Sequence, residues 1–132
     1  MIEIVVVGAH LSGLPLNHEL LSEGGVFRRA VLTEPSYRLY ALAGGPPRRP
    51  GLLRVAPGAG AAIATEVWAL PDDGFGRFVS RIPAPLGIGT LLLSDGSRPK
   101  GFLVEPEGLQ GAEDITRFGA WRAFLASIAT PA

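Results

Sequence analysis

The segment that most constrains the fold is residues 5–17, which read VVVGAHLSGLPLN. An apolar run at residues 2–7 predicts a buried strand, and this strand opens directly into Gly8, Ala9 and His10. Glycine lacks the Cβ atom that would block close approach, so such a loop can aim backbone N–H groups at an anion. Histidine can move a proton at ordinary pH because its unperturbed pKa lies near neutrality. The segment therefore predicts an anion-binding loop beside one proton carrier.

Composition limits the chemistry that the chain can carry. The 132 residues are expected to form one domain, residues 1–132, with a core of its own. The chain has no cysteine, which excludes disulfides and thiol chemistry, and its two histidines leave little room for a metal site. The 12 basic residues balance the 12 acidic ones, whereas binding to nucleic acid usually needs a basic excess. We therefore expect neither a metal nor a nucleic-acid partner.

The ends and the apolar runs of the chain bear on its location. Residues 1–3 lack the basic region of a signal peptide, and no apolar run approaches the roughly 20 residues of a membrane span. The expected location is the cytoplasm, with no membrane partner. The hydrophobic content of 47% is compatible with a buried subunit interface, so a homodimer is a further expectation.

Most of the chain has the pattern of short strands with few helices. Because the strands do not alternate regularly with helices, the pattern favours the α+β class, with a small mixed sheet or barrel and flanking helices. A doubly wound sheet is not expected. The predicted strands are 2–7, 26–32, 37–42, 52–55, 63–70, 90–93 and 101–104, and the predicted helices are 15–22, a helix that opens at 71–73, and 114 to about 128.

Six phrases, taken together and in order, carry a resemblance to a known family. They are VVVGAHLSGLPLN (5–17), PSYRLYAL (35–42), EVWALP (66–71), FGRFVSRIPAPLGIGTLLLSDGS (75–97), KGFLVEP (100–106) and GAEDITRFGAWRAFL (111–125). Together they resemble the C-terminal domain of allophanate hydrolase, and the resemblance covers nearly the whole chain. It implies a fold similar to that of the γ-glutamylcyclotransferases, a small mixed barrel with flanking helices.

The resemblance also implies a function. In that family an amidase domain precedes this one and converts allophanate to N-carboxycarbamate, and the C-terminal domain is implicated in decarboxylating that product. The implied substrate is a small dicarboxylate, the implied partner is an amidase, and no cofactor is needed. His10 is implied as the acid/base, and the loop from Gly8 through Ala9 to Leu11 as the carboxylate-binding site. For His10, a histidine that merely caps the turn is the alternative.

Decarboxylation sets further demands on the site. One carboxylate needs a cation or N–H groups, and the departing one is favoured by an apolar wall. Arg38 and Lys100 are the candidate cations, with simple surface charges as the alternative. The hydroxyls of Tyr37 and Tyr40 are candidates to line the site, although aromatic strand residues usually belong to the core.

Several other interpretations stay open. The 80–90 stretch is either a rigid crossover or the rim of a pocket that faces His10. Glu66 is either catalytic or structural, and Phe124 is a candidate interface residue because it lies off the main apolar stripe of the last predicted helix. Two other functions remain: an accessory subunit for an amidase, and a cyclotransferase-like enzyme of another specificity. The region of Phe78–Ile82 lacks the carboxylate that cyclotransferases carry there, which weakens the second.

Overall fold

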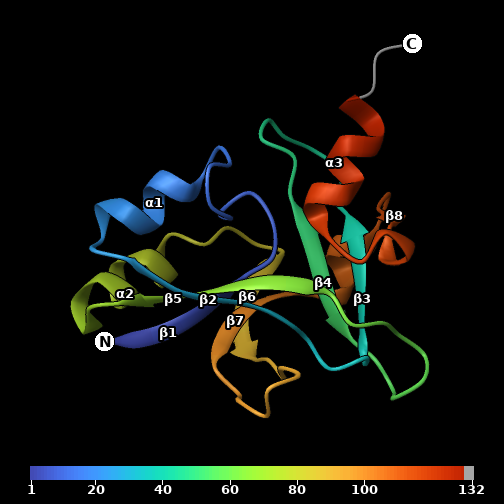
Figure 1. Ribbon diagram of the computed structural model, residues 1–132. Helices are drawn as coiled ribbons and strands as arrows, with labels where there is room; N and C mark the ends of the chain where they lie inside the picture. The colour runs from blue at the N-terminus through green and yellow to red at the C-terminus, as the bar shows by residue number, and fades with distance from the viewer. Residues whose placement is uncertain (130–132) are drawn as a thin grey trace.

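The computed structural model describes residues 1–129, which form two sheets with three α-helices around them (Figure 1). The five-stranded sheet has the order β2-β5-β1-β7-β6, and the three-stranded sheet has the order β4-β3-β8. The strands are β1 (Ile2–Val6), β2 (Val26–Leu32), β3 (Tyr37–Ala41), β4 (Pro50–Arg54), β5 (Ala64–Leu70), β6 (Leu86–Thr90), β7 (Lys100–Val104) and β8 (Glu113–Asp114). The helices are α1 (Asn17–Ser22), α2 (Asp72–Ser80) and α3 (Trp121–Ala129), with 3₁₀ turns η1 (Pro106–Leu109) and η2 (Thr116–Phe118).

Strand β1 lies at the centre of the larger sheet. It pairs antiparallel with β5 over its whole length and parallel with β7 through Ile4 and Val5. Ile4, Val5 and Val6 are fully buried, as expected for a strand with neighbours on both edges. The loop that follows β1 therefore starts in the middle of the fold, where neighbouring elements can reach it.

The expected α+β class is confirmed, with mixed sheets and few helices. Within residues 1–129 the two sheets stay separate, so the structure is not a closed barrel. In Figure 1 the helices α1 and α2 lie side by side at the five-stranded sheet, whereas α3 lies beside the three-stranded sheet. No helix in this described part is long and apolar enough to cross a membrane.

The helix that the sequence predicts to open at residues 71–73 is confirmed as α2. Asp72 and Asp73 occupy its first turn, where negative charge offsets the free N–H groups. Phe78 is buried, and Phe75 and Ile82 pack against the core from the same face. The sequence pattern of period 3.6 was sufficient here because the helix packs one face inward.

The prediction of a strand at residues 90–93 was wrong. The strand that pairs with β7 is β6, which ends at residue 90. Beyond it the chain turns toward the segment that follows β2: the N–H of Ser94 donates to the carbonyl of Leu32, and Leu93 forms a bridge with Thr33. These long-range hydrogen bonds, and not the local pattern, decide the end of the strand.

The predicted helix from residue 114 was also wrong over its first half. Residues 113–114 form β8, and the N–H of Ile115 donates to the carbonyl of Leu39 on β3. Gly119 then adopts a φ of +68°, which ends the short turn η2 before α3 begins. The last helix therefore begins at residue 121 and not at 114, because sheet pairing and a turn occupy the seven residues before it. The later start also changes the face of the helix on which each aromatic residue lies.

Phe124 is buried and is not an interface residue. It is 2% exposed and its ring lies 5.3 Å from that of Trp121 and 5.7 Å from that of Phe118. The helix begins at Trp121, so residues 121 and 124 are three apart on the same inward face. The expectation of an interface role came from assigning the apolar stripe to a helix that begins at residue 114.

Candidate functional site

The loop after β1 is shaped by its own hydrogen bonds. The N–H of Leu11 donates to the carbonyl of Gly8 at 2.9 Å, and the side-chain amide of Asn17 donates to the carbonyl of His10 at 2.8 Å. The N–H of Leu11 is therefore already occupied, and its side chain is buried in the core. Within the described residues the N–H groups of Ala9 and His10 have no acceptor. Two consecutive amides of the loop are therefore free to bind an anion.

His10 lies between two aromatic rings and one carboxylate. Its ring stacks on Phe102 and meets the edge of Phe78, each with ring centres 5.2 Å apart. Its Nε2 lies 2.7 Å from Oε1 of Glu19. A carboxylate only accepts hydrogen bonds, so we assign the proton to Nε2, which leaves Nδ1 as the basic nitrogen. This is the arrangement of an oriented acid/base.

The pKa of His10 is lowered from its ordinary value of 6.5. Burial is the main cause because it disfavours the charged ring, and the nearby Arg49 cation acts in the same direction. The hydrogen bond and the charge of Glu19 oppose this shift without overcoming it. The ring is therefore neutral at neutral pH in the free protein.

Gly8 has a packing role that its sequence context did not indicate. A Cβ at this position would overlap the ring of Pro50, the first residue of β4. The close approach that glycine permits is thus made by another part of the chain, not by a ligand. Because Pro50 sits against Gly8, the preceding residue, Arg49, is held beside the His10 loop.

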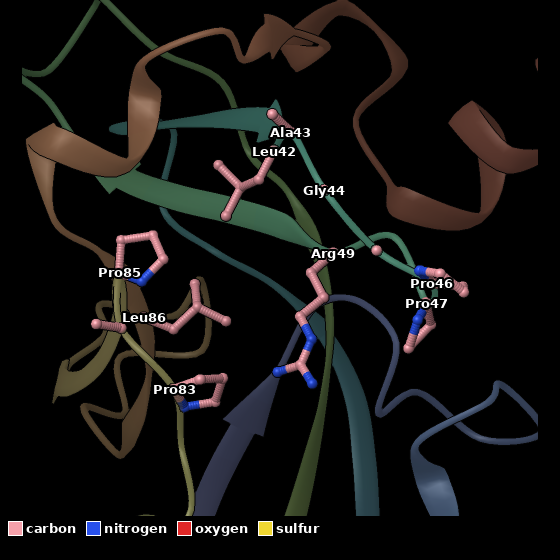
Figure 2. Close-up of a pocket in the computed structure, with 11 residues that line it drawn as sticks. Leu42, Ala43, Gly44, Pro46, Pro47, Arg49, Pro83, Pro85 and Leu86 are labelled. Atoms are coloured by element: carbon pink, nitrogen blue, oxygen red, sulfur yellow. The ribbon is translucent and has the colours of Figure 1, made fainter.

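Three spaces meet at Arg49 and form one cleft. Two small ones adjoin His10 and measure about 20 and 30 Å³, enough for about one water molecule each. A larger pocket of about 310 Å³ lies between residues 42–47 with Arg49 on one side and residues 83–86 on the other (Figure 2). Arg49 lines all three spaces, and residues 83–86 contribute to each of them. The 80–90 stretch therefore does form a pocket rim that faces His10, in part as the strand β6.

Neither tyrosine that the sequence suggested for the site lines this cleft. Tyr37 is fully buried, and its hydroxyl accepts a hydrogen bond from the N–H of Leu92 at 2.9 Å. Tyr40 is half-buried on the same strand, β3, in the smaller sheet. Successive side chains of a strand point to opposite faces, and Tyr37 and Tyr40 are three residues apart, so one tyrosine faces the core and the other faces away from it.

The two suggested cations also lie elsewhere. Arg38 donates to Asp114 at 2.6 Å because β3 and β8 are paired at this point. The exposed Lys100 donates from Nζ to the hydroxyl of Thr90, its partner across the β6–β7 ladder. Of the residues predicted for the site, the structure brings together Gly8, Ala9 and His10. The two tyrosines and the two cations that the sequence suggested do not line the spaces around them.

Sequence reasoning missed Glu19 and Arg49. Glu19 lies nine residues after His10, and the turns of the loop fold it back onto the ring. Its neighbour His18 is exposed, with Nδ1 at 2.9 Å from the carbonyl of Pro15. Arg49 belongs to a segment that reads as an exposed connector, and no local pattern distinguishes it from Arg48.

A second polar cluster holds the other end of the loop. The Oε1 atom of Glu66 accepts hydrogen bonds from the N–H and hydroxyl of Ser12 and from Nε1 of Trp68, at 2.9–3.0 Å. Arg122 donates to the carbonyl of Ser12 and to the Oε2 atom of Glu66. Burial alone would raise the pKa of Glu66, but these combined hydrogen bonds hold it below its ordinary value. The structural interpretation of Glu66 therefore has direct support.

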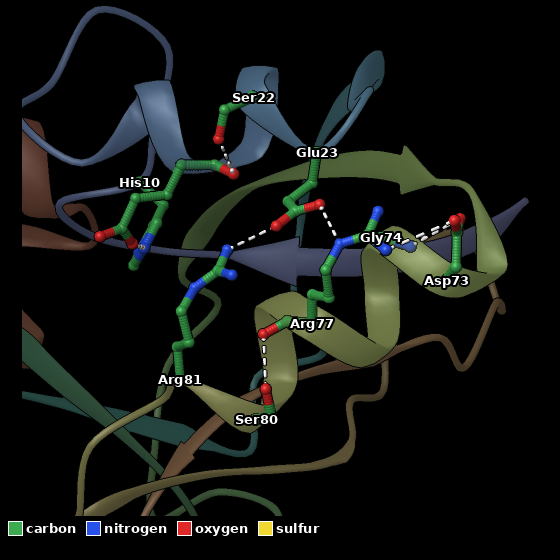
Figure 3. A network of polar contacts seen from close by, with 9 residues as sticks. His10, Ser22, Glu23, Asp73, Gly74, Arg77, Ser80 and Arg81 are labelled. Carbon is green, nitrogen blue, oxygen red and sulfur yellow. Dashed lines mark hydrogen bonds and ion pairs between the residues drawn. The ribbon is translucent and has the colours of Figure 1, made fainter.

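A third cluster joins α1 to α2 (Figure 3). Glu23 pairs with Arg77 at 2.8 Å and with Arg81 at 2.7 Å, and Arg77 also reaches Asp73. Arg81 lines the small space beside Glu19, yet its Nη2 is already bonded to Glu23. Within residues 1–129 no group of three or more histidine and acidic side chains is arranged to hold a metal ion.

Comparisons with known proteins identify the family that this chain resembles. The family model for the allophanate hydrolase C-terminal domain matches residues 2–126. Urea amidolyase from Saccharomyces cerevisiae is 41% identical over 127 residues, which are 94% of this chain and 7% of that protein. The chain thus spans only a small part of the curated relatives that it matches.

Solved structures show the same fold. Allophanate hydrolase from Kluyveromyces lactis superposes with a TM-score of 0.92 at 41% identity, covering 96% of this chain and 21% of that one. A uropathogenic E. coli-specific protein, c4763, gives 0.87 at 34% identity and covers 95% of both chains. An AIG2-like protein from Mus musculus, at 22% identity and a TM-score of 0.60, shares the fold alone, over 83% of this chain and 82% of its own.

Proposed function

We propose, from the premise that this chain belongs to the allophanate hydrolase C-terminal domain family, that it decarboxylates N-carboxycarbamate in the degradation of urea through allophanate. In this proposal His10 carries the proton and the N–H groups of Ala9 and His10 hold one carboxylate. No metal or organic cofactor takes part.

The observation that carries the proposal is the setting of His10. It is buried and stacked on Phe102, its Nε2 is held by Glu19, and two free amides stand beside it. A histidine with a merely structural role would need neither a basic nitrogen beside a cleft nor unsatisfied amides next to it. A small acid–base enzyme needs both.

In the proposed step the bond between nitrogen and one carboxylate carbon breaks, and its electron pair stays on nitrogen. CO₂ leaves, and the nitrogen takes a proton from Nδ1 of His10. The dianion and one proton thus become CO₂ and carbamate. The rings of Phe78 and Phe102 supply an apolar wall that solvates the departing carboxylate poorly and its neutral product well.

The lowered pKa of His10 suits this step. Burial keeps the ring neutral in the free protein. A bound dianion favours the imidazolium, since a nearby negative charge raises the pKa of a histidine. As CO₂ leaves, the proton that moves from the imidazolium to nitrogen neutralises one of the two negative charges of the substrate, so the ring returns to its neutral form beside the carbamate monoanion.

The substrate in this proposal comes from an amidase. The chain matches about 7% of a urea amidolyase and 21% of an allophanate hydrolase, so its relatives join this fold to much larger remainders. N-carboxycarbamate is labile, so supply by an amidase that is joined to this domain or bound to it would limit its spontaneous loss.

The test is turnover of N-carboxycarbamate generated in place. An allophanate amidase supplies the substrate, and release of bicarbonate is followed with and without this protein. We expect the protein to accelerate release over the spontaneous rate in buffer. If the wild-type protein accelerates nothing, either alone or mixed with the amidase, the enzymatic proposal is wrong, and an accessory role that stabilises the amidase takes its place.

A further inference from the structure

Arg49 differs from the other half-buried arginines of the described chain. Arg29 is paired with Glu3 and Asp95, and Arg38 is paired with Asp114. Within residues 1–129 the side chain of Arg49 has neither an ion pair nor a hydrogen bond. A partly desolvated guanidinium without a partner is costly, because five N–H donors are left without the protein acceptors that burial calls for.

The backbone of Arg49 is held firmly while its side chain is not. Its carbonyl accepts a hydrogen bond from the N–H of Leu42 at 3.0 Å, and the next residue, Pro50, packs on Gly8. The side chain extends into the space between the Gly44–Pro47 loop and residues 83–86 (Figure 2). The fold therefore holds the backbone of Arg49 in place and leaves its unpaired guanidinium able to bind a ligand.

The guanidinium of Arg49 lies where the three spaces of the cleft meet. On one side are the small spaces that adjoin His10, and on the other is the pocket of about 310 Å³. The small spaces can hold about one small group each, and Arg49 joins them to the pocket of about 310 Å³, so a longer ligand bound at Arg49 can extend into that pocket. A volume near 300 Å³ falls within the usual range of about 300–1,000 Å³ for small-molecule sites.

We propose that Arg49 binds a carboxylate of the substrate through its guanidinium, and that the pocket beyond it makes the site one for dicarboxylates, including ones longer than N-carboxycarbamate. A guanidinium and a carboxylate form two parallel hydrogen bonds, which lysine cannot reproduce. One carboxylate then lies at the amides of Ala9 and His10, and the second lies at Arg49. This assignment rests on the proposed function, because it takes the same cleft as the substrate site.

The experiment measures binding of inert dicarboxylates by calorimetry. Malonate replaces the NH of N-carboxycarbamate by CH₂, and succinate adds one further carbon. For the wild type we expect succinate to bind within about fivefold of malonate, because the site opens into the larger pocket. Acetate, with a single carboxylate, should bind at least about tenfold more weakly. Hydrogen bonds to charged groups contribute about 1.5–3 kcal/mol, so Arg49→Ala should weaken malonate binding by about 10- to 100-fold.

The matched control is Arg48→Ala, which removes the same charge one residue away. Arg48 lies over the ring of Phe124 and lines a separate, apolar pocket of about 580 Å³, but it lines none of the three spaces that Arg49 lines. It should change the malonate Kd by less than about twofold. Arg49→Lys should recover only part of the affinity, which separates paired hydrogen bonding from charge alone. Equal losses for the two alanine variants, or no loss for Arg49→Ala, would overturn the assignment.

Failure of the proposed function can be told apart from failure of this inference. His10→Ala leaves Arg49 and the backbone amides in place, so it should still bind malonate while losing turnover. If the wild-type protein binds malonate through Arg49 but does not accelerate decarboxylation, the proposed function is wrong and the carboxylate site is supported. If the Arg49→Ala variant turns over the substrate with an unchanged KM, the role of Arg49 is wrong and the proposed function is unaffected.

Discussion

The two ends of the loop after β1 are held by carboxylates in opposite ways. At the far end Glu66 is saturated: Ser12 gives it two hydrogen bonds, Trp68 gives one, and Arg122 adds another. At the near end Glu19 receives one hydrogen bond, from His10, and within the described chain the guanidinium of the neighbouring Arg49 donates none. Polar groups that the chain itself satisfies hold the fold, whereas those left unsatisfied beside a cleft are available to a ligand.

The pKa values of the two ends move downward for different reasons. Glu66 is lowered because hydrogen-bond donors together outweigh its burial and favour the charged carboxylate. His10 is lowered mainly because burial disfavours the charged ring. A lowered pKa thus marks a fixed charge at one end of the loop and a neutral imidazole at the other.

The largest expected effect is on turnover, and it tests the near end of the loop. His10→Ala should reduce decarboxylation of N-carboxycarbamate by about 10²–10⁴-fold, the usual contribution of general acid–base catalysis. His18→Ala is the matched control, because His18 is exposed on α1 outside the cleft. Its rate should stay within about twofold of the wild type in the same amidase-coupled assay. Equal activity of the two variants would remove the proton-carrying role from His10.

The next effect is on stability, and it tests how the near end is built. Gly8→Ala would push a methyl group into the Pro50 ring, which cannot rotate away, so we expect a loss of about 3 kcal/mol in the free energy of unfolding. Malonate binding should fall as well, since Arg49 follows the movement of Pro50. Urea denaturation and calorimetry provide the two measurements.

The same substitution elsewhere should have the opposite sign. Gly76 lies in the exposed interior of α2, and a Cβ there meets nothing within 4 Å. Gly76→Ala should stabilise the protein by about 0.5–1 kcal/mol, because alanine has the higher helix propensity. A loss of stability with Gly8→Ala no greater than the change with Gly76→Ala would mean that the contact with Pro50 is not tight.

The far end of the loop should respond through stability. Glu66→Ala leaves the N–H of Ser12 and Nε1 of Trp68 without their acceptor, and we expect a cost of about 2 kcal/mol in the free energy of unfolding. Glu105→Ala is the control, since this exposed glutamate has no ion pair in the described chain, and its effect should stay within about 0.5 kcal/mol. Denaturant midpoints decide the matter, and equal values for the two variants would show that Glu66 does not hold the loop.

The smallest effect is a dependence of stability on pH. The pKa of His10 is lower in the folded protein than its ordinary value of 6.5, so below about pH 6.5 the unfolded chain binds more protons at this site. The stability that the neutral ring provides is therefore present above pH 6.5 and is lost as the pH falls through the lower, folded-state pKa.

His10→Gln should lack this loss. Between pH 7.5 and 5 the free energy of unfolding should fall more steeply for the wild type than for His10→Gln, as measured by urea denaturation at each pH. His18→Gln controls for removal of a histidine that lies on the surface. Parallel curves for the wild type and His10→Gln would contradict the burial argument.

Part of the fold was predictable from local pattern. The strands β1, β2, β3 and β5 and the helix α2 lie where apolar periodicity placed them, within a few residues. The errors fall where long-range pairing overrides the pattern. Residues 92–94 bond to residues 32–34 at and after the end of β2, and residues 113–115 bond to β3, so neither stretch keeps the structure that its own pattern favours.

The sequence by itself determined that a strand opens into a loop of glycine, alanine and histidine, and it excluded thiol chemistry. These conclusions need only residues that adjoin one another. Tertiary structure decided which side chains surround His10, because Arg49 reaches it through the pairing of β3 with β4 and the contact of Pro50 with Gly8. It also decided that Ser12 meets Arg122 across 110 residues. Local patterns report how a segment folds, whereas partners that distant meet only when sheets and helices pack.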